Sequence, residues 1–230
     1  MMATTLLMAT ISEQLLARAL LYQALAWGLI YPTAERLAGL TEWQDSLATA
    51  CTALGMSASD VETAVAKLPQ SEAARLQMLQ VEYTRLFINA VPHVLAPPYA
   101  SAYNHLGLLL GQPAEAAVQA YRQAGLVFAP EAFDLPDHLA AELEFMFYLS
   151  REELAAHKAG DLTCAEELRE RRRDFLTHHL LAWLPAWRAR VVEADRTGFY
   201  ATLAQLVETW LRADAAALTS PFVESRRIQP

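Results

Sequence analysis

The sequence predicts an all-α protein, a single-domain bundle of roughly 8–11 helices, and three observations lead to this prediction. Hydrophobic residues make up 54% of the 230 residues and charged residues 19%, so the chain can bury a core without disulfides or metals. Apolar residues recur at spacings of three and four along most of the chain. Strand-like alternation of β-branched residues is almost absent. Together these patterns favour helices that pack on helices.

The sequence is expected to form one domain followed by a tail. No internal repeat, low-complexity tract or linker divides it, so residues 1–214 are predicted to be one all-helical domain. Residues 215–230 are expected to be an irregular C-terminal tail. Cys51 and Cys164 lie far apart and form no CxxC motif, which indicates buried free thiols and argues against a redox pair or a zinc site.

The first two helices are predicted from capping boxes. In this motif a Thr side chain and a Glu or Gln three residues later satisfy backbone N–H groups at a helix start. The box at Thr10 is expected to start a helix that ends before Pro32, and the box at Thr41 to start one that Gly55 closes.

The next two helices and the loop after them follow from cap residues and prolines. Ser59 is expected to start a short helix that Pro69 stops, and Ser71 to start one that runs through Phe87. Residues 89–98 contain three prolines, which remove backbone donors and fix φ, so this segment is predicted to be a loop. The loop is apolar, and we therefore expect it to pack on the protein or to be covered by something else.

Three helices are predicted in the next part of the chain. Pro113 in a first turn is expected to start a helix that Gly125 terminates. Pro136 is expected to open the longest helix, which ends at Gly160. Asp161 is expected to cap the helix that follows.

The last part of the predicted domain contains a charged segment, a break and a final helix. Residues 166–174 carry both charge signs at helical spacing, which is typical of a solvated face rather than a nucleic-acid patch. Pro185 is expected to break the helix after Trp183, and Thr197 to begin the last helix.

Charge and hydropathy narrow the class of partner. The chain has 18 basic and 26 acidic residues, a net charge of −8, which disfavours nucleic acid or an anionic membrane and mildly favours a cationic partner. The first residues lack the basic region of a secretory signal, and no uninterrupted apolar run is long enough to span a bilayer. The protein is expected to stay in the cytoplasm.

No familiar catalytic motif is present. The sequence has no phosphate-binding loop, dinucleotide-binding motif, HExxH, GxSxG or calcium loop, so we predict neither an enzyme nor a bound cofactor. His138 and Glu142 are four residues apart and share a helix face, but two ligands are too few for a metal site. His178 and His179 are adjacent and point in different directions on a helix, which makes joint ligation of a metal unfavourable.

Two segments allow both a structural and a functional interpretation. Pro136 and Asp137 make an ordinary helix start, but capping does not explain His138, which is left available for a partner. The stripe that contains Leu86 and Phe87 is read first as core, and the alternative is a contact surface.

Three blocks of sequence, taken together, resemble a known family. They are Glu82-Tyr83-Thr84-Arg85-Leu86-Phe87, Ala96-Pro97-Pro98-Tyr99-Ala100-Ser101-Ala102-Tyr103 and Pro136-Asp137-His138-Leu139-Ala140-Ala141-Glu142-Leu143-Glu144-Phe145-Met146. In this order they resemble the TorD/DmsD family of cytoplasmic chaperones, the redox-enzyme maturation proteins. The resemblance covers the middle of the chain, and the flanking helices match it only in length and helicity.

The resemblance implies an all-helical chaperone that binds the twin-arginine signal peptide of a molybdopterin oxidoreductase, such as a DMSO or TMAO reductase, until its cofactor is inserted. The apo form of that enzyme's catalytic subunit would be its partner. The signal-peptide site implied by the match consists of Leu86, Phe87, Pro98, Tyr99, Ser101, Tyr103, Asp137 and His138. The chain departs from the family pattern after Phe87, where Ile88 and Asn89 replace a usual Gly-Pro, so the register of residues 88–96 stays open.

The chemistry of such a leader suits this chain. Two arginines followed by an apolar stretch need carboxylates beside an apolar groove. Arginine favours carboxylates through bidentate hydrogen bonds, which makes Asp137, Glu142 and Glu144 candidate partners.

Two other classes of function remain as alternatives. One is a metal- or nucleotide-dependent hydrolase that uses His138 and Glu142, although no phosphate cradle is apparent. The other is a helical scaffold or oligomerisation module. A long loop between helices would also allow a homodimer to form by domain swapping.

Overall fold

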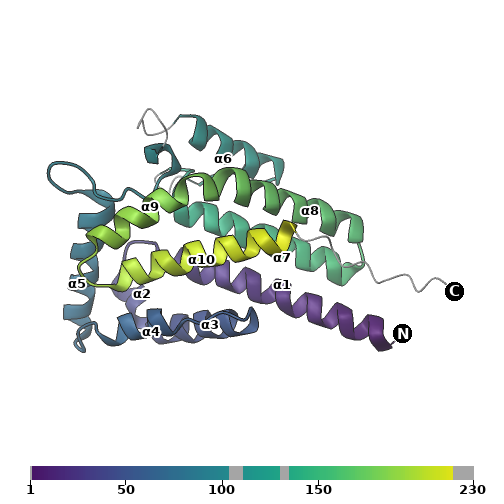
Figure 1. The fold of residues 1–230 in the computed structure, drawn as a ribbon, viewed down its shortest axis with the longest axis horizontal. Coiled ribbons are helices and arrows are strands. Elements are labelled where there is room, and N and C mark those ends of the chain that lie inside the picture. The colour runs from purple at the N-terminus through teal and green to yellow at the C-terminus, as the bar shows by residue number, and fades with distance from the viewer. Residues whose placement is uncertain (1, 104–110, 130–134, 220–230) are drawn as a thin grey trace.

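The computed structural model describes residues 2–103, 111–129 and 135–219, and it is almost entirely helical in these ranges (Figure 1). They contain ten α-helices and three short helical turns, and the one β interaction described is an isolated antiparallel bridge between Tyr99 and His138. The all-α prediction and the expected number of helices are confirmed.

The elements follow one another along the chain with short connections. The α-helices are α1 Met2–Gly28, α2 Ala34–Ala38, α3 Leu40–Ala53, α4 Ser59–Ala66, α5 Glu72–Tyr83, α6 Gln112–Gln123, α7 Leu139–Ala159, α8 Leu162–Phe175, α9 Leu181–Ala194 and α10 Phe199–Thr219. The short turns are the π-helix η1 Thr84–Ile88, the 3₁₀-helix η2 Ala100–Tyr103 and the π-helix η3 Leu176–Leu180.

Helix α1 crosses the centre of the bundle. It packs against α3 on one side and α7 on the other, α7 packs against α8, and α10 packs against α9 and α4 (Figure 1). The core between these helices is rich in aromatic rings, and it includes fully buried Tyr22 and Trp187. None of the described helices is both long and apolar enough to cross a membrane.

Several predicted helix ends are confirmed. Ser71 caps α5 by accepting a hydrogen bond from the backbone of Ala74, and Asp161 caps α8 by accepting one from Cys164. Pro113 lies in the first turn of α6. Gly160 ends α7 in the left-handed conformation, at φ 77°, which a glycine adopts without steric cost.

Other predicted ends were wrong. Helix α1 begins at Met2, so Thr10 lies inside it, and its 27 residues make it longer than the 21-residue α7. Gly39 rather than Thr41 occupies the N-cap of α3, whereas α4 begins at Ser59 as predicted. These boxes were misplaced because local capping signals also occur inside helices that packing extends.

The C-terminal boundary also needs correction. Helix α10 runs through Thr219, five residues beyond the expected end of the domain at Asp214. The remainder of the predicted tail, residues 220–230, lies outside the described residues. Asp214 itself is fully buried and accepts a hydrogen bond from Tyr22 at 2.7 Å, so the helix is held by a polar contact that sequence periodicity does not reveal.

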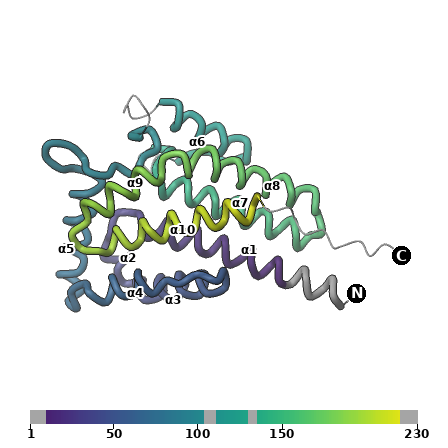
Figure 2. Tube along the Cα trace, viewed as in Figure 1, coloured from purple at the N-terminus to yellow at the C-terminus, as the bar shows by residue number. Residues whose placement is uncertain are grey.

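Pro185 does not separate two helices. It lies inside α9, and α8, η3 and α9 form one uninterrupted helical path (Figure 2). The π-turn of η3 shifts the hydrogen-bond register just before the proline, which allows the chain to remain helical across it.

The charged helix α8 is not wholly solvated. Arg172 is fully buried and forms ion pairs with Glu153 of α7 and with Asp214 of α10, the latter at 2.9 Å. Its neighbours Arg171 and Glu170 are exposed, as predicted. Of the two free cysteines, Cys51 is buried as expected but Cys164 is only partly buried.

Candidate functional site

The site is formed where the loop after α5 meets the start of α7. Tyr99 and His138 form the antiparallel bridge, and backbone hydrogen bonds of 3.0 and 2.8 Å flank the pair. The second and third blocks of sequence are therefore in direct contact. The first block joins them because the carbonyl oxygen of Leu86 accepts a 2.8 Å hydrogen bond from Ala96.

Most of the predicted site residues are buried in this structure. The buried ones are Leu86, Phe87, Pro98, Ser101, Asp137, His138 and Glu142, whereas Tyr99 and Tyr103 are partly exposed. The predicted residues therefore divide into a supporting layer and a rim. Only the rim is directly open to a partner in this conformation.

The Asp137 side chain holds the loop at Ser101 in place and does not cap helix α7. Its Oδ2 accepts a 2.7 Å hydrogen bond from the backbone N–H of Ser101, which holds the η2 turn against the start of α7. The side chain is fully buried, and its Oδ1 has no hydrogen-bond partner among the described residues. The expectation that Asp137 lies in the first turn of a helix was wrong, since α7 begins at Leu139.

His138 is the N-cap of α7. Its Nδ1 accepts a 3.1 Å hydrogen bond from the backbone N–H of Ala140, and its ring lies edge-on to Tyr99 with the ring centres 5.2 Å apart. Capping therefore does account for this histidine, contrary to the sequence analysis. Histidine is an uncommon N-cap, so residue-type preferences gave no signal for this role.

Leu86 and Phe87 are core residues. Leu86 is fully buried, and Phe87 stacks against Trp187 of α9 and meets Tyr200 of α10 edge-on. The core interpretation of this stripe is confirmed. Both residues also fix the point at which the chain leaves η1 and enters the proline-rich loop, so they position the site from below.

Glu142 pairs with His179, a residue that the sequence analysis did not select. The distance from Glu142 Oε1 to His179 Nε2 is 2.6 Å, and the glutamate is fully buried. Burial raises the pKa of Glu142 to about 7, although the neighbouring His179 opposes the rise. Burial also lowers the pKa of His179, but Glu142 and Asp137 more than offset this, and its net shift is upward.

The signal for His179 was present in the spacing. Phe175, His179 and Trp183 lie four residues apart, and His179 stacks on Phe175 with ring centres at 4.7 Å. His178 is exposed and lies 3.2 Å from Thr177 through its Nδ1. The two histidines therefore point in different directions, as predicted.

A cavity opens beside the Glu142–His179 pair. Its volume is about 310 Å³, and it lies between η2, the start of α6 and the η3–α9 segment. Tyr103 and Trp183 stack on its wall with ring centres 5.5 Å apart. Arg190 of α9 also lies over the Tyr103 ring, with its guanidinium carbon 4.8 Å from the ring centre.

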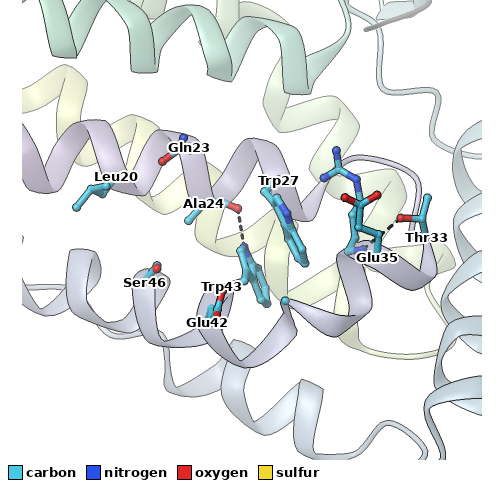
Figure 3. A pocket seen from close by; sticks show the side chains of 11 residues that line it. Leu20, Gln23, Ala24, Trp27, Thr33, Glu35, Glu42, Trp43 and Ser46 are labelled. Atoms are coloured by element: carbon cyan, nitrogen blue, oxygen red, sulfur yellow. Dashed lines mark hydrogen bonds between the residues drawn. The ribbon is translucent and has the colours of Figure 1, made fainter.

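A second cavity, of about 600 Å³, lies between α1, α2 and α3 (Figure 3). Trp27 and Trp43 stack there with ring centres 5.3 Å apart, and the indole N–H of Trp43 donates to the carbonyl of Ala24 at 2.7 Å. None of the residues predicted from the sequence lines it. It is larger than the first cavity, but it is remote in sequence from all three blocks.

The described residues contain no group of three or more His, Cys, Asp or Glu side chains arranged to hold a metal ion. The sequence likewise offers no phosphate cradle. The site therefore consists of a buried polar cluster beside a cavity with an aromatic wall. The buried cap His138 and the buried Glu142 do not form the accessible pair that the hydrolase alternative requires.

Known proteins identify the family. Residues 38–189 match the family model described as nitrate reductase delta subunit. The chain is 30% identical over 162 residues to the chaperone protein TorD of Vibrio cholerae, covering 70% of this chain and 71% of that protein. It is 29% identical over 215 residues to the perchlorate reductase assembly chaperone protein of Dechloromonas aromatica, covering 87% and 89%.

The fold agrees with these matches. A putative redox enzyme maturation protein from Archaeoglobus fulgidus has a similar structure, with a TM-score of 0.51 at 22% identity, covering 87% of this chain and 93% of that one. The chain belongs to the nitrate reductase delta subunit family and is a TorD-like chaperone.

Proposed function

We propose that the chain binds the twin-arginine signal peptide of a molybdopterin oxidoreductase, of the DMSO or TMAO reductase type, and assists cofactor insertion before export. Its client would be the apo form of the catalytic subunit, and it would act in the cytoplasm. The observation that carries the proposal is the contact among the three sequence blocks at the Tyr99–His138 bridge. Residues far apart in sequence thus meet at one place in the fold.

The proposed contact surface has two layers. Tyr99 and Tyr103 form the accessible rim, on which the apolar part of a leader peptide can pack. Beneath them Asp137 holds the loop and His138 caps α7, and Asp137 and Glu142 are acidic groups. The net charge of −8 favours encounter with a basic leader.

The names of the relatives support a chaperone for a reductase, but they do not mention a leader peptide. The Dechloromonas aromatica protein is named as a perchlorate reductase assembly chaperone, and a further relative from Ideonella dechloratans, 44% identical over 78 residues, as a chlorate reductase assembly chaperone. A reductase as client is therefore well founded. Recognition through the leader peptide is the finer step that needs an experiment.

Calorimetric titration with a panel of twin-arginine leader peptides from molybdoenzymes tests the proposal. We expect binding by the wild-type chain and a loss of about tenfold or more in affinity for Tyr103→Ala, because aromatic anchors dominate peptide contacts. Tyr31→Ala is the matched control, since Tyr31 is also partly exposed but packs against Tyr83 outside the site. If no leader in the panel binds the wild-type chain, the proposed function is wrong.

A further inference from the structure

We propose that an exposed apolar face on α5 and the loop after it binds the apolar stretch of the leader peptide, the part that follows the two arginines. The face consists of Met78, Val81, Ile88 and Val91, and we call it the end face. Helix α5 lies at one end of the bundle, and the loop after it extends from that end (Figure 1). The identity of the ligand as a leader peptide rests on the proposed function.

Exposed large apolar side chains are concentrated in this segment. Four of the eight in the described part of the chain form the end face, and their exposed fractions run from 41% for Met78 to 96% for Val91. Met78 and Val81 are three residues apart on one face of α5, and Ile88 follows seven residues after Val81. Single exposed apolar residues are ordinary on a protein surface, but a group of them indicates a binding surface.

The charged side chains of this segment do not lie on the end face. Residues 73–93, all of them described, include three residues of the Asp, Glu, Lys or Arg type, and none of these is exposed. Arg85 and Glu82 form an ion pair at 2.6 Å, and Arg75 donates to the backbone carbonyl of Pro69 at 2.9 Å. An uncharged apolar face therefore remains in a chain whose net charge is −8.

This chemistry suits the apolar stretch of the leader and not its arginines. Within residues 73–93 no exposed carboxylate is available to pair with an arginine. An uncharged apolar helix can be buried on the end face without the desolvation of a charge. The lengths also agree. The apolar region of an export leader has about 7–15 residues, and α5, with 12 residues, is about 18 Å long.

The end face is joined to the surface proposed for the leader. The backbone N–H of Ala96 donates to the carbonyl of Leu86 at 2.8 Å, so the loop after η1 returns to its own starting point. Three residues later the chain reaches Tyr99, whose bridge with His138 holds it against the start of α7. The end face and Tyr99 of the rim therefore lie at the two ends of one closed loop. A leader held at the rim can extend its apolar stretch over the end face.

Val81→Glu tests the end face, and Leu162→Glu is its matched control. Leu162 of α8 is exposed to a similar degree, 56% against 60% for Val81, so both variants should keep the thermal stability of the wild type, and both add one negative charge. We expect Val81→Glu to weaken the binding of a twin-arginine leader about tenfold or more in calorimetry, because a carboxylate would be buried against the apolar stretch. Leu162→Glu should bind like the wild type.

The outcomes separate the two proposals. Equal binding of the leader by wild type and Val81→Glu overturns the inference about the end face and leaves the proposed function standing. A wild-type chain that binds no leader contradicts both.

A methyl resonance locates the bound stretch directly. In the full chain with isotope-labelled methionine methyl groups, the leader should shift the resonance of Met78, and that of the fully buried Met146 should stay unchanged. A leader that keeps its two arginines but has serines in place of its apolar residues should leave Met78 unchanged. If the unaltered leader binds in calorimetry without a shift of Met78, the inference is wrong.

A second copy of the chain is the other occupant that such a face allows. Sedimentation of the free chain distinguishes it from the leader, and we expect Val81→Glu to sediment like the wild type. A wild-type dimer that Val81→Glu dissociates would mean that a second copy covers the end face, and it would overturn the proposal.

Discussion

Two buried clusters in this chain both contain acidic side chains and differ in the cationic group that these side chains face. In the first, Arg172 lies between Glu153 and Asp214, and Tyr22 donates to Asp214 as well. In the second, Asp137 and Glu142 face one histidine, His179, and the Trp183 side chain also interacts with Glu142. The first cluster joins α1, α7, α8 and α10, whereas the second lies beside a cavity.

The difference indicates two roles for buried charge. In the first cluster, which we call the closed cluster, a permanent cation lies between two carboxylates and joins helices of the bundle. In the second cluster, which we call the open cluster, the group that faces the two carboxylates is a histidine. Its positive charge is present only when the imidazole is protonated. Perturbed ionisable groups beside a cavity are typical of functional sites, whereas buried ion pairs that join helices are typical of structural networks.

The largest effect is expected at the closed cluster. Arg172→Met removes the cation that Glu153 and Asp214 share, although Arg18 remains 3.1 Å from Asp214, and breaking a buried ion pair from one side costs about 3–5 kcal/mol. Urea denaturation should show this loss of stability. The fraction of Arg172→Met that stays folded should bind leader peptide with unchanged affinity. A reduced affinity in the folded fraction would contradict the division between the two clusters.

A smaller loss of stability is expected at Asp137. Asp137→Ala removes the acceptor of the Ser101 backbone N–H, and an unpaired buried donor costs about 1–3 kcal/mol. Ser101→Ala keeps that backbone bond and should cost less than about 1 kcal/mol. Thermal unfolding of both variants checks the comparison. Similar losses in the two would mean that the hydrogen bond to Asp137 contributes little.

The sequence allowed the open cluster to be predicted only in part. Asp137, His138 and Glu142 were found because they form one block with a helix-start pattern. His179 lies about forty residues later on another helix, and only the packing of α7 against η3 brings it to Glu142. Fold class, most helices and the contact between blocks followed from periodicity and resemblance. The burial of Arg172 could not be predicted in this way, because the charged residues around it in the sequence are typical of a solvated face.

The open cluster should make stability depend on pH. The pKa of Glu142 is raised by burial from its usual 4.5 to about 7, so between these values the folded state holds a proton that the unfolded state has lost. His179, whose pKa is also raised, acts in the same direction above its usual value of 6.5. Stability from both groups is fully present at low pH and is lost as the pH rises through about 7.

We therefore expect the wild-type chain to lose on the order of 2–3 kcal/mol between pH 5 and pH 8, since one pKa unit corresponds to about 1.4 kcal/mol. Glu142→Gln should flatten this dependence, and Glu152→Gln should keep it. Urea denaturation across this pH range measures the slopes. Parallel slopes for wild type and Glu142→Gln would show that the buried pair does not control the pH response.

The smallest effect is expected at the cap of α7, where structure and recognition can be separated by residue type. His138→Ala removes the acceptor for the Ala140 N–H and should cost about 1 kcal/mol. His138→Asn restores a good N-cap and should recover that stability. If the imidazole also contacts a leader peptide, His138→Asn should still bind it more weakly than the wild type in calorimetry. Full recovery of both stability and binding would mean that His138 serves the helix alone, and recognition would then depend on Tyr99 and Tyr103.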